Sequence, residues 1–191
     1  TTIKRNTTNE LSRMRKTTLS NPHSGTTLIE IMVVLSILAI LANLALFHVQ
    51  PFFAQTRLEN YSHLIKRTLS LARNNAISLN SQITVCSLAS SVCDNSRWHQ
   101  GLTVFVDKDE VGVFGDNDTV ILVTEAINES DMLTYPRDAV TYRPDGTPRG
   151  FDNGTFVYCA EYKSAELAGI AISVSTTGKT TLKDTDECQT N

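Results

Sequence analysis

The sequence predicts an α+β fold, with one long N-terminal helix packed on an antiparallel β-sheet domain. Two observations predict the helix: a uniformly apolar run, followed directly by a stretch with apolar residues at helical spacing. A third predicts the sheet, because beyond Asn80 the pattern changes to alternation with frequent turn residues. The 191 residues suffice for one globular domain in addition to a membrane segment.

The apolar run extends from Ile31 to Phe47 without a charged residue. With Leu28 and Ile29 it approaches the length that spans a bilayer. Residues 1–25 hold five basic side chains against one acidic side chain, so the positive-inside tendency places this end in the cytoplasm. We therefore expect a single inner-membrane pass over 26–53 and a periplasmic domain over 54–191.

Glu30 is an anomaly at the start of this run. An ionisable side chain near a membrane is costly and usually marks a function, and a buried carboxylate needs a cation. No Lys or Arg follows before Arg57. A cut after Gly25 would create an α-amino group at Thr26, and the amine of one subunit could then pair with Glu30 of the next subunit in a filament.

The second half of the helix, over 54–80, is amphipathic. Its apolar residues recur at intervals of three and four, which predicts one stripe packed on a core: Leu58, Tyr61, Ile65, Leu69, Ala72, Ala76 and Leu79.

The β-domain, over 81–191, is expected to contain seven strands separated by Asp-, Gly- and Pro-rich turns. The predicted strands are Gln82–Ser87, Leu102–Asp107, Thr119–Glu125, Ala139–Arg143, Thr155–Cys159, Ile170–Ser175 and Thr180–Lys183.

All four cysteines follow the apolar run, at positions Cys86, Cys93, Cys159 and Cys188. Their spacing lacks Cys-x-x-Cys pairs, which disfavours a zinc site and favours two disulfides in an oxidising compartment. Three pairings are open. We favour a short polar loop closed by Cys86–Cys93 and a C-terminal tail fastened by Cys159–Cys188.

The remaining chemistry is sparse, and we expect no metal, no cofactor, no catalytic residues and no enzyme activity. The loop from Asp107 to Asp118 partly matches a calcium loop, but Val111 occupies a ligand position and the flanking helices are absent, which favours a solvated hairpin. No Gly-x-Ser-x-Gly elbow is present. Residues 26–191 carry 12 basic and 19 acidic groups, a net charge of −7 that disfavours binding to nucleic acid.

The string from Gly25 to Glu30, Gly-Thr-Thr-Leu-Ile-Glu, with the apolar run after it, resembles the class III leader and N-terminal helix of type IV pilins and type II secretion pseudopilins. The resemblance implies that a prepilin peptidase cuts after Gly25, that Thr26 is N-methylated, and that Glu30 pairs with a neighbouring amine during assembly. Thr26 departs from the family's usual Phe. Residues 1–25 form the leader, and Met14 is an alternative start for it.

Further blocks, over 71–80, 83–86, 98–107 and 173–179, are similar to the GspH/FimT group of minor pilins, which includes FimU-like proteins. This resemblance implies a type IV pilin fold and a minor pilin that enters or primes the pilus and supports twitching motility. The implied partners are major and minor pilins, the prepilin peptidase, the inner-membrane assembly platform and, before assembly, membrane lipid. The implied final location is the cell surface.

Two alternatives stay open, a GspH-like type II secretion pseudopilin and a DNA-binding minor pilin for natural transformation. The resemblance places the DNA element of some FimT-like pilins at a Gly-Arg-x-Arg motif, where this chain has Gly178-Lys179-Thr180-Thr181 without either arginine. The candidate DNA-binding residues are Lys179, Arg137, Arg143 and Arg149.

Overall fold

The computed structural model describes residues 25, 27–160 and 169–189, with the backbone alone for 44–52. Its contacts divide the chain into two compact units, Thr1–Leu44 and Ala45–Asn191, whereas the sequence analysis placed the boundary after Phe53. The helix α1 (Leu28–Leu79) contributes residues to both units. We call its described residues 27–44 the N-terminal segment and residues 45–191 the domain.

The N-terminal segment is helical from Leu28 onward and exposes its apolar side chains in every direction. The exposed large apolar residues are Leu28, Ile29, Ile31, Met32, Val33, Val34, Leu35, Ile37, Leu38, Ile40 and Leu41. Among the described residues, no helix combines the length and the apolar character needed to cross a membrane. The membrane pass over 26–53 stays a prediction.

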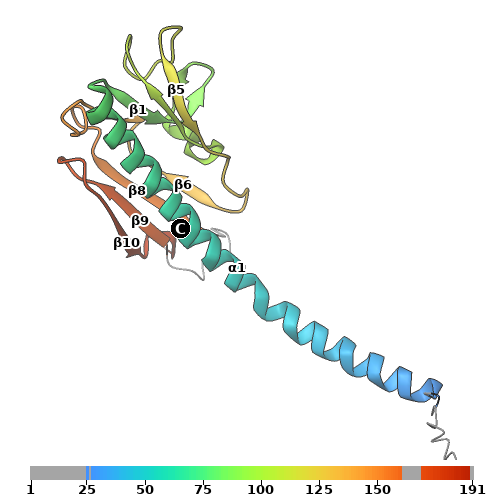
Figure 1. Cartoon of the computed structure of the whole chain (residues 1–191). Helices are drawn as coiled ribbons and strands as arrows, with labels where there is room; N and C mark the ends of the chain where they lie inside the picture. Colours follow the sequence, from blue (N-terminus) through green and yellow to red (C-terminus); the bar gives the residue numbers. More distant parts are fainter. Residues whose placement is uncertain (1–24, 26, 161–168, 190–191) are drawn as a thin grey trace, which may run out of the picture. The chain divides into compact units, whose positions relative to one another are not determined.

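The domain contains two four-stranded antiparallel sheets and one short hairpin (Figure 1). The first sheet has the order β5 (Thr119–Val123), β4 (Thr103–Val106), β1 (Ile83–Cys86) and β7 (Ala139–Tyr142). The second has the order β10 (Thr180–Thr185), β9 (Gly169–Val174), β8 (Gly154–Cys159) and β6 (Met132–Thr134). The hairpin pairs β2 (Leu88–Ala89) with β3 (Val92–Cys93), and two 3-10 helices are η1 (Asn95–Gln100) and η2 (Glu187–Gln189).

All seven predicted strands are present with small shifts at their ends, and the α+β class with a long helix on antiparallel sheets is confirmed. The sequence analysis missed β2, β3 and β6, each two or three residues long and therefore too short to show an alternating pattern. It also did not foresee that the strands divide into two sheets.

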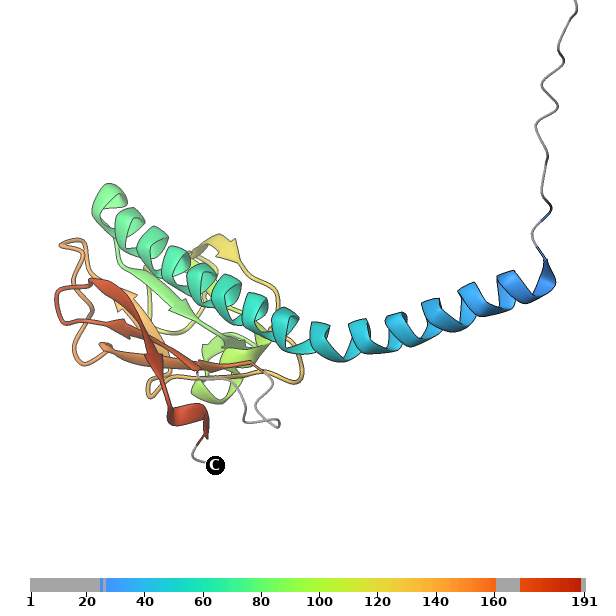
Figure 2. The same ribbon diagram turned by 90° about the horizontal axis from the view of Figure 1, so that it is seen from below.

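The 45–79 part of α1 lies across both sheets, and both sheets lie on the same side of this helix (Figure 2). Its predicted stripe is buried at five positions that join one core with both sheets: Leu58, Ile65, Leu69, Ala72 and Ala76. Tyr61 is half-buried. Leu79 is 52% exposed, so its placement in the stripe was wrong; it is the last residue of α1, and the chain turns at Asn80 with φ 49°.

Trp98 of η1 is fully buried in the core. Its ring meets the rings of Phe156 and Tyr135 edge-on, with centroid distances of 5.0 and 5.5 Å. Its indole Nε1 donates a hydrogen bond of 3.1 Å to the carbonyl of Arg137. Because a buried indole N–H needs an acceptor, this bond fixes the orientation of the largest core side chain.

Two disulfides tie the domain, Cys86–Cys93 and Cys159–Cys188. This is the pairing that the sequence analysis favoured. The first joins β1 to β3, and the second joins β8 to η2.

Candidate functional site

The N-terminal segment begins with a capped helix. The carbonyl of Thr27 accepts hydrogen bonds from the backbone N–H groups of Glu30 and Ile31, at 3.0 and 3.3 Å, and its Oγ1 accepts from Glu30 N at 3.4 Å. Thr27 is therefore the N-cap and Glu30 the third helical residue, where a carboxylate favours the positive end of the helix dipole. The sequence analysis missed this local role, although Thr-x-x-Glu is the signature of a capping box.

The predicted cleavage site lies partly outside the described residues. Gly25 is described and exposed, whereas Thr26 and the leader residues 1–24 are outside the described part. An added Cβ at Gly25 would meet nothing within 4 Å. The glycine is therefore not required by packing in the described chain.

The polar side chains of the N-terminal segment satisfy themselves within the helix. Ser36 Oγ donates to the carbonyl of Met32 at 2.7 Å, and Asn43 Nδ2 donates to the carbonyl of Ala39 at 2.8 Å. Because these donors already have acceptors one turn earlier, the helix can enter an apolar environment without leaving them unsatisfied.

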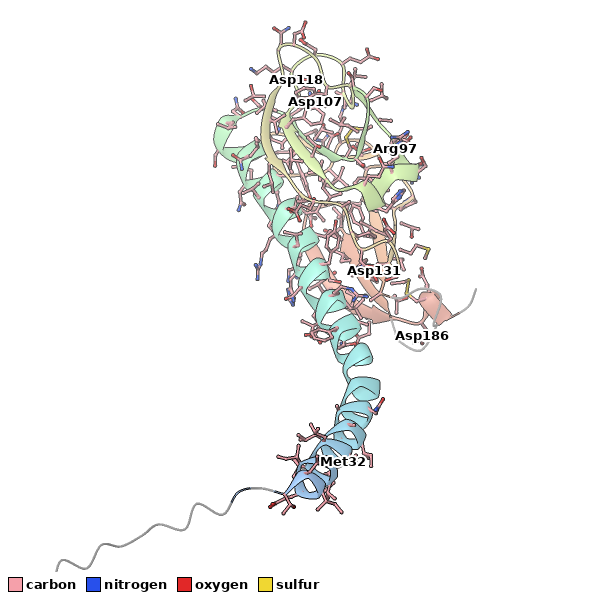
Figure 3. The ribbon with its side chains drawn as sticks, turned by 90° about the vertical axis from the view of Figure 1, so that its right-hand side faces the viewer. Met32, Arg97, Asp107, Asp118, Asp131 and Asp186 are labelled. Atoms are coloured by element: carbon pink, nitrogen blue, oxygen red, sulfur yellow. A yellow bond between two sulfur atoms is a disulfide. The ribbon has the colours of Figure 1, made fainter. Side chains whose placement is uncertain are left out.

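A partly buried ion pair anchors the domain part of α1 to the second sheet. Arg57 Nη2 lies 3.3 Å from Asp131 Oδ1, and the side chain of Asp131 is completely buried beside the helix (Figure 3). Tyr158 donates its hydroxyl to Asp131 Oδ2 at 2.6 Å. Burial and this hydrogen bond raise the pKa of Tyr158 far above its ordinary value. No local pattern could reveal the pair, since its members are 74 residues apart.

Arg73 clamps two turns of the β-domain to the end of α1. Its Nε donates to the carbonyl of Gly146 at 2.9 Å, and its Nη2 donates to the carbonyl of Thr177 at 3.1 Å. The turns also touch each other, because a Cβ added to Gly178, where φ is 77°, would lie 2.1 Å from the carbonyl oxygen of Gly146. The sequence predicted both turns but not their contact.

This contact brings two of the four candidate DNA-binding residues into adjacent turns, Lys179 in one and Arg143 in the other. Arg143 is engaged locally, since its Nη2 donates to Thr147 Oγ1 at 2.7 Å and its Nε lies 3.8 Å from Asp145 Oδ1. Hydrogen bonds from the hydroxyl and N–H of Thr147 hold the pKa of Asp145 below its usual value.

The other two, Arg137 and Arg149, line a separate open hollow of about 500 Å³ together with the carboxylates of Asp138 and Asp152. Arg137 Nε donates to the carbonyl of Phe151 at 2.9 Å. Burial raises the pKa of Asp152, whose Oδ2 accepts from the N–H of Thr141. The four residues therefore form no single patch, and carboxylates accompany three of them.

Asp107 and Asp118 of the 107–118 loop accept hydrogen bonds from the loop itself and, at Asp107, also from β1. Asp107 Oδ2 accepts from Thr84 Oγ1 at 2.6 Å and from Gly112 N at 2.9 Å. Asp118 accepts from the N–H groups of Lys108 and Gly115, both at 2.8 Å. This arrangement is a self-capped turn. In the described residues, no group of three or more His, Cys, Asp or Glu side chains is placed to hold a metal ion.

The sequence matches two known protein-family models. Residues 63–178 match the family model described as type II transport protein GspH. This match covers more than half of the chain. The chain belongs to the GspH family. Residues 21–42 match the prokaryotic N-terminal methylation motif, which covers Gly25, Thr26 and Glu30. No curated protein sequence matches the chain.

Solved structures show the fold of this GspH-family chain. The type IV minor pilin FimU of Pseudomonas aeruginosa matches with a TM-score of 0.55 at 19% identity, over 72% of this chain and 99% of that one. The minor pseudopilin EpsH of the Vibrio cholerae type 2 secretion system matches with a TM-score of 0.48 at 16% identity, over 67% and 97%. The fold is the type IV pilin fold expected from the sequence.

The GspH match extends from the amphipathic part of α1 to the Gly178 turn, so it includes the Arg73 clamp, the first sheet and the second sheet apart from β10. The match to the methylation motif, over residues 21–42, covers the apolar start of α1 and its cap at Thr27. The GspH-family chain is thus a structural subunit of the minor pilin or pseudopilin class, of the type IV pilus or type II secretion kind.

Proposed function

We propose that the chain is a minor type IV pilin that is cut after Gly25 and then enters or primes a pilus through its apolar helix. The observation that carries this proposal is the N-terminal segment, where eleven large apolar side chains are exposed on all sides of one helix. A helix that is apolar all round must be buried, and an exposed apolar surface of this extent marks an interaction site. Helices of neighbouring pilins supply the burial.

Glu30 gives this packing its register. Its position in the first turn of α1 sets a carboxylate at the helix start, next to the proposed cleavage point. After a prepilin peptidase cuts behind Gly25 and Thr26 is methylated, the amine of Thr26 in one subunit pairs with Glu30 of its neighbour. In an apolar filament core an unpaired carboxylate is costly, so only registers that form this pair are stable.

Before assembly, the proposal places residues 26–53 in the inner membrane, with residues 1–25 in the cytoplasm and 54–191 in the periplasm. The methylation motif and the apolar character of the segment support this arrangement. The inner-membrane assembly platform then extracts the helix into the filament. Two disulfides suit a domain that folds in the oxidising periplasm.

The experiment compares Glu30→Ala with the control Glu59→Ala. Glu59 is an exposed carboxylate in the domain part of the same helix, outside the buried stripe. We expect Glu30→Ala to be cleaved normally but to fall at least about tenfold in sheared filaments, since losing a partner of a buried ion pair costs about 3–5 kcal/mol. Glu59→Ala should behave as the wild type. Normal recovery of Glu30→Ala in filaments would refute the proposal.

The cleavage site has its own test. Gly25→Lys should accumulate the uncut precursor, whereas Gly25→Ala tests how far a small side chain is tolerated. The precursor and mature forms are separated by intact-mass measurement. Efficient maturation of Gly25→Lys would show that the peptidase does not act at this glycine.

The second candidate is a type II secretion pseudopilin, which is favoured by the family description itself. Deleting the gene and scoring surface pili, exoprotein secretion and uptake of external DNA in the same cells separates the candidates. Lost pili support the minor pilin, whereas lost secretion with normal pili supports the pseudopilin. Lost uptake alone would reinstate the DNA-binding alternative.

A further inference from the structure

The strand β5, labelled in Figure 1, forms one open edge of the first sheet and carries no charged residue. It pairs with β4 alone, and its sequence is Thr-Val-Ile-Leu-Val. Val120 and Val123 are 44% and 63% exposed. Within residues 27–160 and 169–189, the backbone of β5 makes no hydrogen bond outside the ladder with β4. The N–H and C=O groups that point away from β4 are therefore open to another strand.

The other three edges of the two four-stranded sheets are protected. At β7 the chain blocks its own edge. The carbonyl of Thr141 accepts from Arg149 N at 2.7 Å, and the N–H of Thr141 donates to Asp152 Oδ2 at 3.1 Å. β10 carries the charged residues Lys183 and Asp184, and β6 is only three residues long. Blocking, charge and shortness are ways in which proteins prevent an edge strand from pairing, and β5 shows none of them.

A bulge in β5 restricts how another strand can pair with it. Val104 of β4 pairs with Leu122. The next residue, Phe105, pairs with Val120, which leaves Ile121 as an extra residue in β5. A bulge increases the local twist, and a twisted edge opposes the flat, repeated pairing of aggregates. The edge therefore suits a single strand that follows this twist.

Two conditions define the molecule that this edge accepts. Its backbone must be extended, because only an extended chain presents N–H and C=O groups at the spacing of a strand. Its ends must be basic, because carboxylates flank β5 on both sides. The 107–118 loop before β5 holds five carboxylates and one cation, Lys108, and residues 124–131 after it hold three carboxylates and no Lys or Arg.

A second copy of β5 does not meet the charge condition. Asp116 and Glu125 are exposed on opposite sides of the strand in the sequence. An antiparallel pair of β5 strands brings Asp116 of each copy towards Glu125 of the other, and a parallel pair brings each residue towards its equivalent. Both arrangements oppose like charges, which destabilises strand pairing. The incoming strand therefore belongs to a different protein.

We propose that β5 accepts one extended strand of a different subunit of the assembled filament, with uncharged residues in its middle and Lys or Arg at both ends. The inference rests on the proposed assembly function and adds a contact of the domain with one neighbour. A five-residue strand pairs weakly by itself, but subunits held together in a filament give the pair a high effective concentration. Because β5 is the one unprotected edge of the two described sheets, the contact joins one pair of subunits and does not propagate.

The first test is the incorporation of Val123→Lys into filaments sheared from cells that make the full chain. We expect incorporation to fall about tenfold, because a charge on an edge strand opposes pairing. Thr181→Lys adds the same charge at an exposed position of β10 and should leave incorporation unchanged. Thermal unfolding of the full chain in detergent should be the same for both variants, since both side chains are exposed.

The second test reverses the charges that flank β5. Asp116→Lys/Glu125→Lys should also lower incorporation about tenfold, because its lysines then face the basic ends of the partner strand. Asp184→Lys/Asp186→Lys makes the same charge change at exposed positions in and after β10 and should be incorporated as the wild type is.

The partner is identified by photocrosslinking in living cells, with a benzophenone side chain in place of that of Val123 in the full chain. We expect a crosslinked peptide from another filament subunit, in which uncharged residues lie between Lys or Arg residues. A crosslink to β5 of a second copy, or to a helix of another subunit, would contradict the inference.

Normal incorporation of Val123→Lys or of Asp116→Lys/Glu125→Lys would also overturn the inference. If this occurs while Glu30→Ala still fails to enter filaments, the strand contact is wrong and the assembly function stands. If Glu30→Ala enters filaments normally, the assembly function itself fails.

Discussion

The two ends of α1 use apolar residues in opposite ways. In the domain, apolar residues recur at intervals of three and four, and five of the seven residues of this stripe are buried against the two sheets. In the N-terminal segment they occupy nearly every position, and all the large ones whose side chains the structure describes are exposed. The domain therefore derives its stability from within one chain, whereas burial of the N-terminal segment requires other molecules.

The polar side chains of the two regions also differ in where their hydrogen-bond partners come from. In the domain, Asp131 is buried and finds partners at Arg57 and Tyr158, which come from distant parts of the sequence. In the N-terminal segment, Ser36 and Asn43 bond to carbonyls one turn earlier, and Glu30 lies at the helix start. Of these three side chains, only that of Glu30 has no hydrogen-bond partner among the described residues, and the assembly proposal therefore centres on it.

The largest expected effect separates the two regions directly. Leu69→Ala removes a fully buried side chain and should lower the free energy of unfolding of the domain by about 2–5 kcal/mol. Leu35→Ala makes the same change at a side chain that is 59% exposed, and should leave this free energy unchanged while reducing incorporation into filaments. Thermal unfolding and filament recovery are measured for both. Equal destabilisation by the two variants would contradict the division.

The disulfides should matter for the domain alone. By the loop-entropy relation, losing Cys159–Cys188, with a sequence separation of 29, should cost about 3.6 kcal/mol. Losing Cys86–Cys93, with a separation of 7, should cost about 2.4 kcal/mol. Denaturant unfolding of the paired Cys→Ser variants checks the order. A larger loss from the shorter loop would show that local packing around Cys86 dominates.

The hydrogen bond of Tyr158 to the Arg57–Asp131 ion pair has a smaller expected effect. Tyr158→Phe removes the 2.6 Å hydrogen bond to Asp131 Oδ2, to which Arg57 Nε still donates at 3.4 Å. The loss should cost about 1.5–3 kcal/mol, the range for a hydrogen bond to a charged group. Tyr135→Phe is the matched control. It removes a hydroxyl that donates a hydrogen bond to a neutral acceptor, the backbone carbonyl of Asp152. Tyr158→Phe should destabilise the domain more than Tyr135→Phe does.

The smallest effect is a dependence on alkaline pH. Burial raises the pKa of Tyr61 and of Tyr142 to about 12, from 10.0. Between these two pKa values the folded domain keeps the two hydroxyl protons that the unfolded chain has released. The contribution of Tyr61 and Tyr142 to the free energy of unfolding is therefore complete below pH 10 and is lost as pH rises through about 12. Tyrosinate absorbance and thermal unfolding follow this together. Titration of both residues at the ordinary tyrosine pKa would contradict their burial.

Sequence periodicity predicted the elements better than their contacts. It found the helix and seven strands, because burial on one face of an element leaves a repeating pattern. It placed Leu79 in the core wrongly and left out Ser62 and Thr68, which are buried, since residue type alone does not show where a helix leaves its sheet. The Arg57–Asp131 pair and the Arg73 clamp join residues 73 or more positions apart, and no local pattern reports such contacts.

The central claim is that the chain becomes a filament subunit through its N-terminal segment, and intact-mass measurement of the protein in sheared filaments tests it most directly. The account predicts a chain that begins at Thr26, carries one methyl group and retains both disulfides. A chain that is absent from the filaments, or present there with residues 1–25 still attached, would contradict it.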